Sequence, residues 1–235
     1  TFSRDARLVL IASGLQGFAF WGLYGSLFNL YLLRLGWGPE FIGLILGAGG
    51  LSWALAGLPG GAFAQRHGLR GPMVLGMGLF ATGLILTSIT GQLPASWQKG
   101  WALITYVVAQ FGGGFCNASF SPALMAFSHE DTCDTLFSVR QALLGLTGFA
   151  GSLLGGWLPG WWARRTQMPL DQPTPYRWTL LIGALTCLPA VWILRATRPV
   201  RIEEPTKRPG ERSQVPYGVL IPLSLVTLLR ILGEF

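Results

Sequence analysis

Long apolar runs alternate with short polar connections along most of the chain. Each run is about as long as the roughly 20 apolar residues that a helix needs to cross a bilayer. No run before the last has a Lys, Arg, Asp or Glu near its middle. The first six runs are 8–33, 41–64, 72–92, 101–127, 138–162 and 177–195, and a seventh begins near Val215 and reaches Phe235.

The length of these runs selects one membrane architecture. Because lipid offers no hydrogen-bond partners, only α-helices and closed β-barrels cross a membrane. A barrel strand needs about 10 residues of alternating polarity, whereas these runs are longer and uniformly apolar. We therefore predict an all-α membrane protein in which the first six helices form a bundle.

The stretch RATRPVRIEEPTKRPGERSQVP, residues 195–216, interrupts the apolar pattern. It is charged, rich in proline and nearly free of large apolar residues, so it cannot form a packed core. We predict a six-helix transmembrane domain over 1–195, a cytoplasmic linker over 196–214 and one further helix over 215–235. No polar tail follows that helix, and we expect the chain to be a fragment of a longer protein.

Composition and charge support a membrane protein and orient it. Only 11% of the residues are charged, against roughly 25% in soluble domains. The net charge of +7 is spread between the apolar runs, which indicates membrane orientation rather than a nucleic-acid partner. An N-terminus inside the cell places eleven Lys and Arg on the cytoplasmic side and five opposite. We predict an integral protein of the plasma (inner) membrane with a cytoplasmic N-terminus.

The cysteines and histidines indicate no metal site and no cofactor. The three cysteines are far apart, and both histidines fall in connections. Neither a disulfide framework nor a zinc-ligand spacing is present. We therefore expect neither a bound metal nor another cofactor.

Glycines and basic residues meet in the connection GGAFAQRHGLRGPMVLG, residues 60–76. Gly68 suits a tight turn between helices, and Pro72 suits the first turn of a helix. Arg66 and Arg70 follow the positive-inside rule. From the residues alone, this segment is a short cytoplasmic turn that carries orienting charge.

The same connection resembles the signature of the Major Facilitator Superfamily. That signature reads Gly, three residues, Asp, a basic residue, any residue, Gly, any residue and one or two basic residues. The matching positions are Gly61, Gln65, Arg66, Gly68 and Arg70. Gln65 stands where the family has Asp. The glycine-rich run GLTGFAGSLLGGWLPG, 145–160, also resembles the fifth helix of these transporters.

The resemblance implies a twelve-helix transporter, of which this chain is the first half and one helix of the second. A small-molecule substrate would bind between the halves and be exposed to each side in turn. The missing second half would then be a partner in the site. The loop 61–70 would act as a cytoplasmic gate, although the amide of Gln65 cannot form an ion pair.

Polar residues within the runs are candidates for the substrate or ion pathway. Gln110, Gly114, Asn117 and Ser121 recur at helical spacing and share one face. They either line a cavity or form interhelical hydrogen bonds beside packed glycines. In the first run, Gln16 is a candidate for the cavity; Asn29 lies on the opposite face, so at most one of the two faces a given cavity.

Two further arginines differ in their expected roles. Arg230 and Glu234, four residues apart, share a helical face within the last run. In one interpretation Arg230 binds an anionic substrate group or a coupling carboxylate and Glu234 is a proton-coupling site; in the other, Glu234 simply lies at the far interface. Arg140 follows the acidic segment HEDTCD, and we expect it to be a charge at the cytoplasmic interface.

Glycine pairs at spacing four indicate close helix packing. Such pairs allow helix backbones to approach one another in a membrane. The pairs are Gly43/Gly47, Gly57/Gly61, Gly151/Gly155 and Gly156/Gly160.

These observations favour a secondary active transporter that is coupled to ions, in particular to protons. The alternative is a seven-helix receptor or sensor, although the seventh run lacks a lysine for a retinal Schiff base. The buried positions hold no Ser/His or paired-carboxylate arrangement, so we do not expect an enzyme.

Overall fold

The computed structural model describes residues 2–128 and 132–200, and within these ranges all regular structure is helical. The predictions for the seventh helix, for most of the linker and for Arg230 and Glu234 lie outside the described residues. The elements are α1 (Arg4–Gln16), η1 (Gly17–Tyr24), α2 (Gly25–Arg34), α3 (Pro39–His67), α4 (Arg70–Ser88), η2 (Thr90–Gln92), α5 (Ala95–Phe127), α6 (Cys133–Thr166) and α7 (Thr174–Arg195). The prediction of an all-α fold is confirmed.

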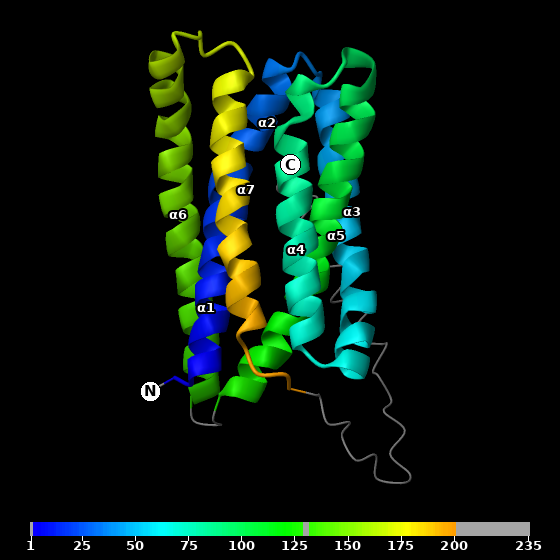
Figure 1. The fold of residues 1–235 in the computed structure, drawn as a ribbon, viewed down its shortest axis with the longest axis vertical. Coiled ribbons are helices and arrows are strands. Elements are labelled where there is room, and N and C mark those ends of the chain that lie inside the picture. The colour runs from blue at the N-terminus through cyan, green and yellow to red at the C-terminus, as the bar shows by residue number, and fades with distance from the viewer. Residues whose placement is uncertain (1, 129–131, 201–235) are drawn as a thin grey trace, which may run out of the picture. The chain divides into compact units, whose positions relative to one another are not determined.

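The helices run up and down as one bundle (Figure 1). α1, η1 and α2 form a single continuous crossing, so the described chain crosses the bundle six times. The start of α1, the α3–α4 turn, the end of α5, the start of α6 and the end of α7 share one end of the bundle (Figure 1). We call this end the N-terminal end.

Local sequence explains where the helices begin and end. The Ser3 side chain accepts a hydrogen bond from the Ala6 N–H (3.2 Å) and caps α1. α3 begins with Pro39, whose missing N–H costs nothing in a first turn. α3 ends at His67, and the capping residue Gly68 has a φ of +81°, a conformation that glycine adopts without strain.

Five of the crossings are long and apolar enough to span a membrane by length and composition. They are Arg4–Arg34, Pro39–His67, Arg70–Gln92, Cys133–Thr166 and Thr174–Arg195. α5 has 33 residues and is therefore long enough, but its mean hydropathy is lower. Its glycines and polar side chains cause this, and several of them pack against other helices or line a cavity, among them Gly112, Gln110 and Asn117.

Glycines set the closest approaches between helices. A Cβ at Gly76 of α4 would lie 2.6 Å from the Gly112 carbonyl oxygen of α5. A Cβ at Gly22 of η1 would lie 2.6 Å from the Gly151 Cα of α6. Backbones this close give the extensive van der Waals contact that associates helices in lipid.

The predicted glycine pairs divide into two groups. Gly151 and Gly155 pack against the first crossing, as expected. The other three pairs, on α3 and the second half of α6, have no described atom within 4 Å of an added Cβ. These glycines therefore leave smooth helix faces that the described part of the chain does not cover. The packing expectation is confirmed only for the pair Gly151/Gly155.

Buried tyrosines tie the first crossing to α4. The Tyr24 hydroxyl donates to the Leu84 carbonyl oxygen (2.5 Å) and lies 2.7 Å from the Ser88 Oγ. The Tyr31 hydroxyl donates to the Ser88 carbonyl oxygen (3.1 Å) and accepts from the Gly91 N–H (2.9 Å). Each hydroxyl satisfies a group that lipid would leave unpaired.

Candidate functional site

A cavity of about 890 Å³ lies between the first crossing, α3, α5 and α6. Gln16, Trp53 and Gln110, which line it, lie near the middle of their crossings. Its polar wall consists of Gln16, Gln110, Asn117, Arg140, Gln141 and Ser152, and its large apolar wall of Phe20, Trp21, Trp53, Leu144 and Phe149. A pocket with mostly apolar walls and a few polar groups is typical of a small-molecule site.

Arg140 is the charged residue of this wall. It is only 9% exposed. Its Nε donates to the Ser13 Oγ (3.2 Å) and its Nη2 donates to the Asn117 Oδ1 (3.2 Å). Its guanidinium also lies 5.0 Å from the centroid of the Phe120 ring. Side chains from α1 and α5 therefore hold a cation that α6 supplies.

The structure places Arg140 inside the bundle, on the cavity wall, and its expected position at the level of the cytoplasmic interface stays a prediction. α6 begins at Cys133, several residues before the apolar run at 138. Seven residues of helix carry Arg140 about 10 Å into the bundle from that start. The apolar run showed where the sequence loses its charge, whereas the helix begins earlier, with polar residues. Sequence reasoning thus missed a cavity residue, and the adjacent Gln141 was its one available signal.

The predicted stripe on α5 divides between both of its interpretations. Gln110 and Asn117 lie on the cavity wall. Gly114 instead packs against α3, where an added Cβ would collide with the Trp53 carbonyl. Ser121 is exposed and lies outside the wall. The roles of Gln110 and Asn117 in substrate binding stay a prediction.

Gln110 brings an unpaired acceptor to this wall. Its Nε2 lies 3.4 Å from the Tyr106 hydroxyl oxygen. Its Oε1 is buried and has no hydrogen-bond partner among the described residues. A buried acceptor without a partner costs about 1–3 kcal/mol, and a ligand that donates a hydrogen bond would remove this cost.

The first crossing contributes to the wall through a π-helical segment. Gln16 is buried and lines the cavity, whereas Asn29 is exposed and does not; at most one was expected to do so. The segment η1 begins at the next residue and presents Phe20 and Trp21. Phe20 stacks on Trp53 of α3, with ring centroids 5.7 Å apart. π-helical turns often occur at functional sites, and nothing in the sequence predicted this one.

The predicted gating residues lie apart from the cavity, at the N-terminal end. Gln65 and Arg66 are exposed, and Gly68 is buried in the turn after α3. The neighbouring Leu69 N–H donates to the Val200 carbonyl oxygen (3.0 Å). Gly61 and Arg70 are partly buried on either side. The gating role of these five residues stays a prediction.

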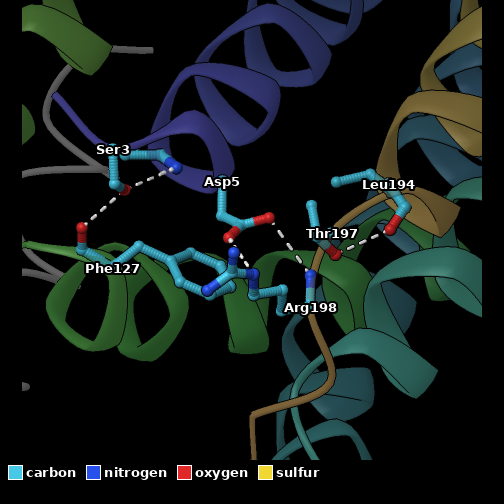
Figure 2. Close-up of polar contacts among 7 residues, drawn as sticks. Ser3, Asp5, Phe127, Leu194, Thr197 and Arg198 are labelled. Carbon is cyan, nitrogen blue, oxygen red and sulfur yellow. Dashed lines mark hydrogen bonds and ion pairs between the residues drawn. The ribbon is translucent and has the colours of Figure 1, made fainter.

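A second polar cluster ties the N-terminal end together (Figure 2). The buried Asp5 accepts the Arg198 backbone N–H at 3.1 Å and lies 3.7 Å from its Nε. The Ser3 hydroxyl donates to the Phe127 carbonyl oxygen (2.8 Å). This end cluster joins the start of α1 to the end of α5 and to the segment after α7.

Among the described residues, no group of His, Cys, Asp and Glu could hold a metal ion.

Comparison with known proteins identifies the bundle. A crystal structure of a POT family transporter in complex with 5-aminolevulinic acid has a similar fold, with a TM-score of 0.61 and 17% identity. The match covers 98% of this chain but 46% of that chain, so this chain spans about half of that structure. No curated protein sequence matches. The family model described as Major Facilitator Superfamily matches residues 9–233. The chain therefore belongs to the Major Facilitator Superfamily of membrane transporters.

Proposed function

We propose that this chain forms one half of a secondary active transporter that moves a small solute by alternating access. The observation that carries the proposal is the cavity of about 890 Å³ at mid-bundle, lined from four crossings. Transporters of this kind bind substrate near the middle of the membrane, between two structural repeats. Membership of a transporter family does not favour the alternative of a seven-helix receptor or sensor.

The second half of the transporter would cover α3 and α6. The most apolar window of each of these helices is only 22% buried, against 61% for the first crossing. Their unpacked glycines would allow another helix to slide along them. The cavity would then close on one side of the membrane while it opens on the other. We place the N-terminal end, with the loop 61–70, in the cytoplasm.

We further propose that proton movement drives transport. Glu234 would carry the proton and Arg230 would lie beside it as a charge partner, both outside the described residues. A carboxyl group in a membrane helix has a cost that a proton removes. This makes a reversible protonation step available during each cycle.

The test is solute-dependent proton flux in the full-length protein. Proteoliposomes that enclose a pH-sensitive dye are given carboxylates, amines, sugars and dipeptides in turn. We expect at least one solute to acidify the lumen, and we expect Glu234→Gln to abolish this signal while solute exchange persists. If Glu234→Gln leaves the signal intact, Glu234 is not the coupling residue. If no solute is transported or exchanged, the transport function itself is wrong.

A further inference from the structure

We propose that the cavity takes an organic anion with an apolar body, and that Arg140 binds its anionic group. This inference rests on the proposed transport function and names the chemical class of the substrate. It depends on three features of the cavity: an unbalanced positive charge, unused hydrogen-bond donors and a wall of aromatic rings.

The positive charge of Arg140 is not balanced within the described part of the chain. The other polar residues of the wall are amides and a serine, which are neutral. The hydrogen-bond acceptors of Arg140, Ser13 and Asn117, are neutral as well. A charge held within a membrane bundle is costly unless it is paired. A bound anion would supply the missing counter-charge.

The guanidinium group has donors to spare. It carries five N–H groups, and the bonds to Ser13 and Asn117 engage its Nε and Nη2. The remaining N–H groups form a planar fork that suits a carboxylate or phosphate. Ser13, Asn117 and the Phe120 ring fix the direction of this fork. They are positioning residues, and Arg140 is the residue that would contact the ligand.

The rest of the wall suits an apolar body rather than a small inorganic anion. Phe20 and Trp53 stack on one another across η1 and α3. Trp21 and Phe149 line the same cavity and are 61% and 65% exposed. Aromatic side chains in the wall of a cavity favour an apolar or aromatic ligand.

Gln110 adds a second recognition point. It lies seven residues from Asn117 on α5, which corresponds to about 10 Å along the helix. Its unpartnered Oε1 would accept a hydrogen bond from an N–H or O–H group of the ligand. The wall therefore fits an anion whose far end carries a donor.

The first test measures the charge of the cavity without a substrate. Gln141→Cys is introduced into full-length protein that carries Cys133→Ser, and its reaction with anionic and cationic methanethiosulfonate reagents is compared. We expect the ratio of the anionic to the cationic reaction rate to be at least tenfold higher for Gln141→Cys than for a free thiol in solution. Arg140→Gln should abolish this preference, and Arg164→Gln, at an exposed residue far from the cavity, should leave it unchanged. A preference unaffected by Arg140→Gln would overturn the proposal.

The second test measures ligand class by thermal stabilisation of the full-length protein in detergent. The probes are 4-phenylbutyrate and indole-3-acetate, each compared with its uncharged primary amide. We expect a carboxylate to raise the Tm at a concentration at least tenfold lower than its amide. Arg140→Gln should remove that difference and Arg140→Lys should retain part of it. Equal effects of acid and amide, or no effect of either acid, would overturn the proposal.

A third variant keeps the tests decisive if Arg140→Gln fails to fold. Asn117→Asp places a carboxylate beside the guanidinium without removing it, because Asn117 already accepts its Nη2 N–H. We expect it to abolish both preferences for anions. A preference that survives Asn117→Asp would overturn the assignment. Proton flux driven only by uncharged solutes would leave the transport function intact and overturn the substrate class.

Discussion

The cavity and the end cluster both contain an arginine, but the buried charge is a cation in the cavity and a carboxylate in the end cluster. In the cavity, the cation of Arg140 is 9% exposed and meets neutral acceptors. In the end cluster, the carboxylate of Asp5 is buried, and the side chain of its partner Arg198 is 84% exposed. Asp5 is satisfied within the chain, whereas Arg140 is not.

This difference separates a structural site from a binding site. The buried carboxylate of Asp5 accepts a backbone N–H and lies beside a cation that water also reaches. Its bonds connect segments that are far apart in sequence, so its role is to hold them. The incomplete pairing of Arg140 instead leaves a place for a ligand.

Arg140→Gln should have the largest effect, and it should fall on binding. A hydrogen bond to a charged group contributes about 1.5–3 kcal/mol, so we expect the KM for a carboxylate substrate to rise by about 10- to 100-fold. The Tm without substrate should stay the same or rise, because an uncompensated charge is removed. Uptake into proteoliposomes measures the first effect and thermal unfolding the second. A large fall in Tm with unchanged KM would make Arg140 a structural residue like Asp5.

Asp5→Ala should show the opposite pattern. It leaves the Arg198 backbone N–H without its acceptor and removes the ion pair, so we expect a loss of about 1–2 kcal/mol in the free energy of unfolding. KM should not change, since Asp5 lies outside the cavity wall. Thermal unfolding in detergent measures the loss. Asp5→Asn, which retains an acceptor oxygen, is the matched control and should lose less.

Ser13→Ala tests whether the support of Arg140 matters. It removes one hydrogen bond from the Nε but leaves the charge and the bond to Asn117. We expect KM to rise less than for Arg140→Gln, by about 3- to 10-fold, in line with one bond of about 1 kcal/mol. Concentration-dependent uptake decides this. An effect equal to that of Arg140→Gln would mean that Ser13 contacts the substrate itself.

Arg198→Gln should have the smallest effect. Its side chain is largely exposed and its Nε lies 3.7 Å from the carboxylate, so we expect less than about 1 kcal/mol of destabilisation. The backbone N–H of residue 198, which Asp5 accepts, remains. Any loss should shrink at high salt, because salt screens exposed pairs. A loss as large as that of Asp5→Ala would show that the ion pair, rather than the backbone hydrogen bond, holds the end cluster.

The cavity was only partly predictable. Gln16, Gln110 and Asn117 were candidates because an uncharged polar residue within an apolar run is visible in the sequence. Which of them share a wall was not visible, since Gly114 and Ser121 have the same helical spacing but lie elsewhere. A helical face can be read from spacing, but its neighbour depends on how the other helices pack.

Local physical chemistry determined the all-helical membrane fold and the number of crossings before α7 ends. Both follow from the length of the apolar runs, because a helix of that length crosses a bilayer and makes its backbone hydrogen bonds within itself. The tertiary structure decided the burial of Arg140, because its partners Ser13 and Asn117 are 127 and 23 residues away. It also decided the link between Asp5 and Arg198, 193 residues apart. A residue's hydropathy is local, whereas its electrostatic surroundings are set by residues that folding brings from elsewhere in the chain.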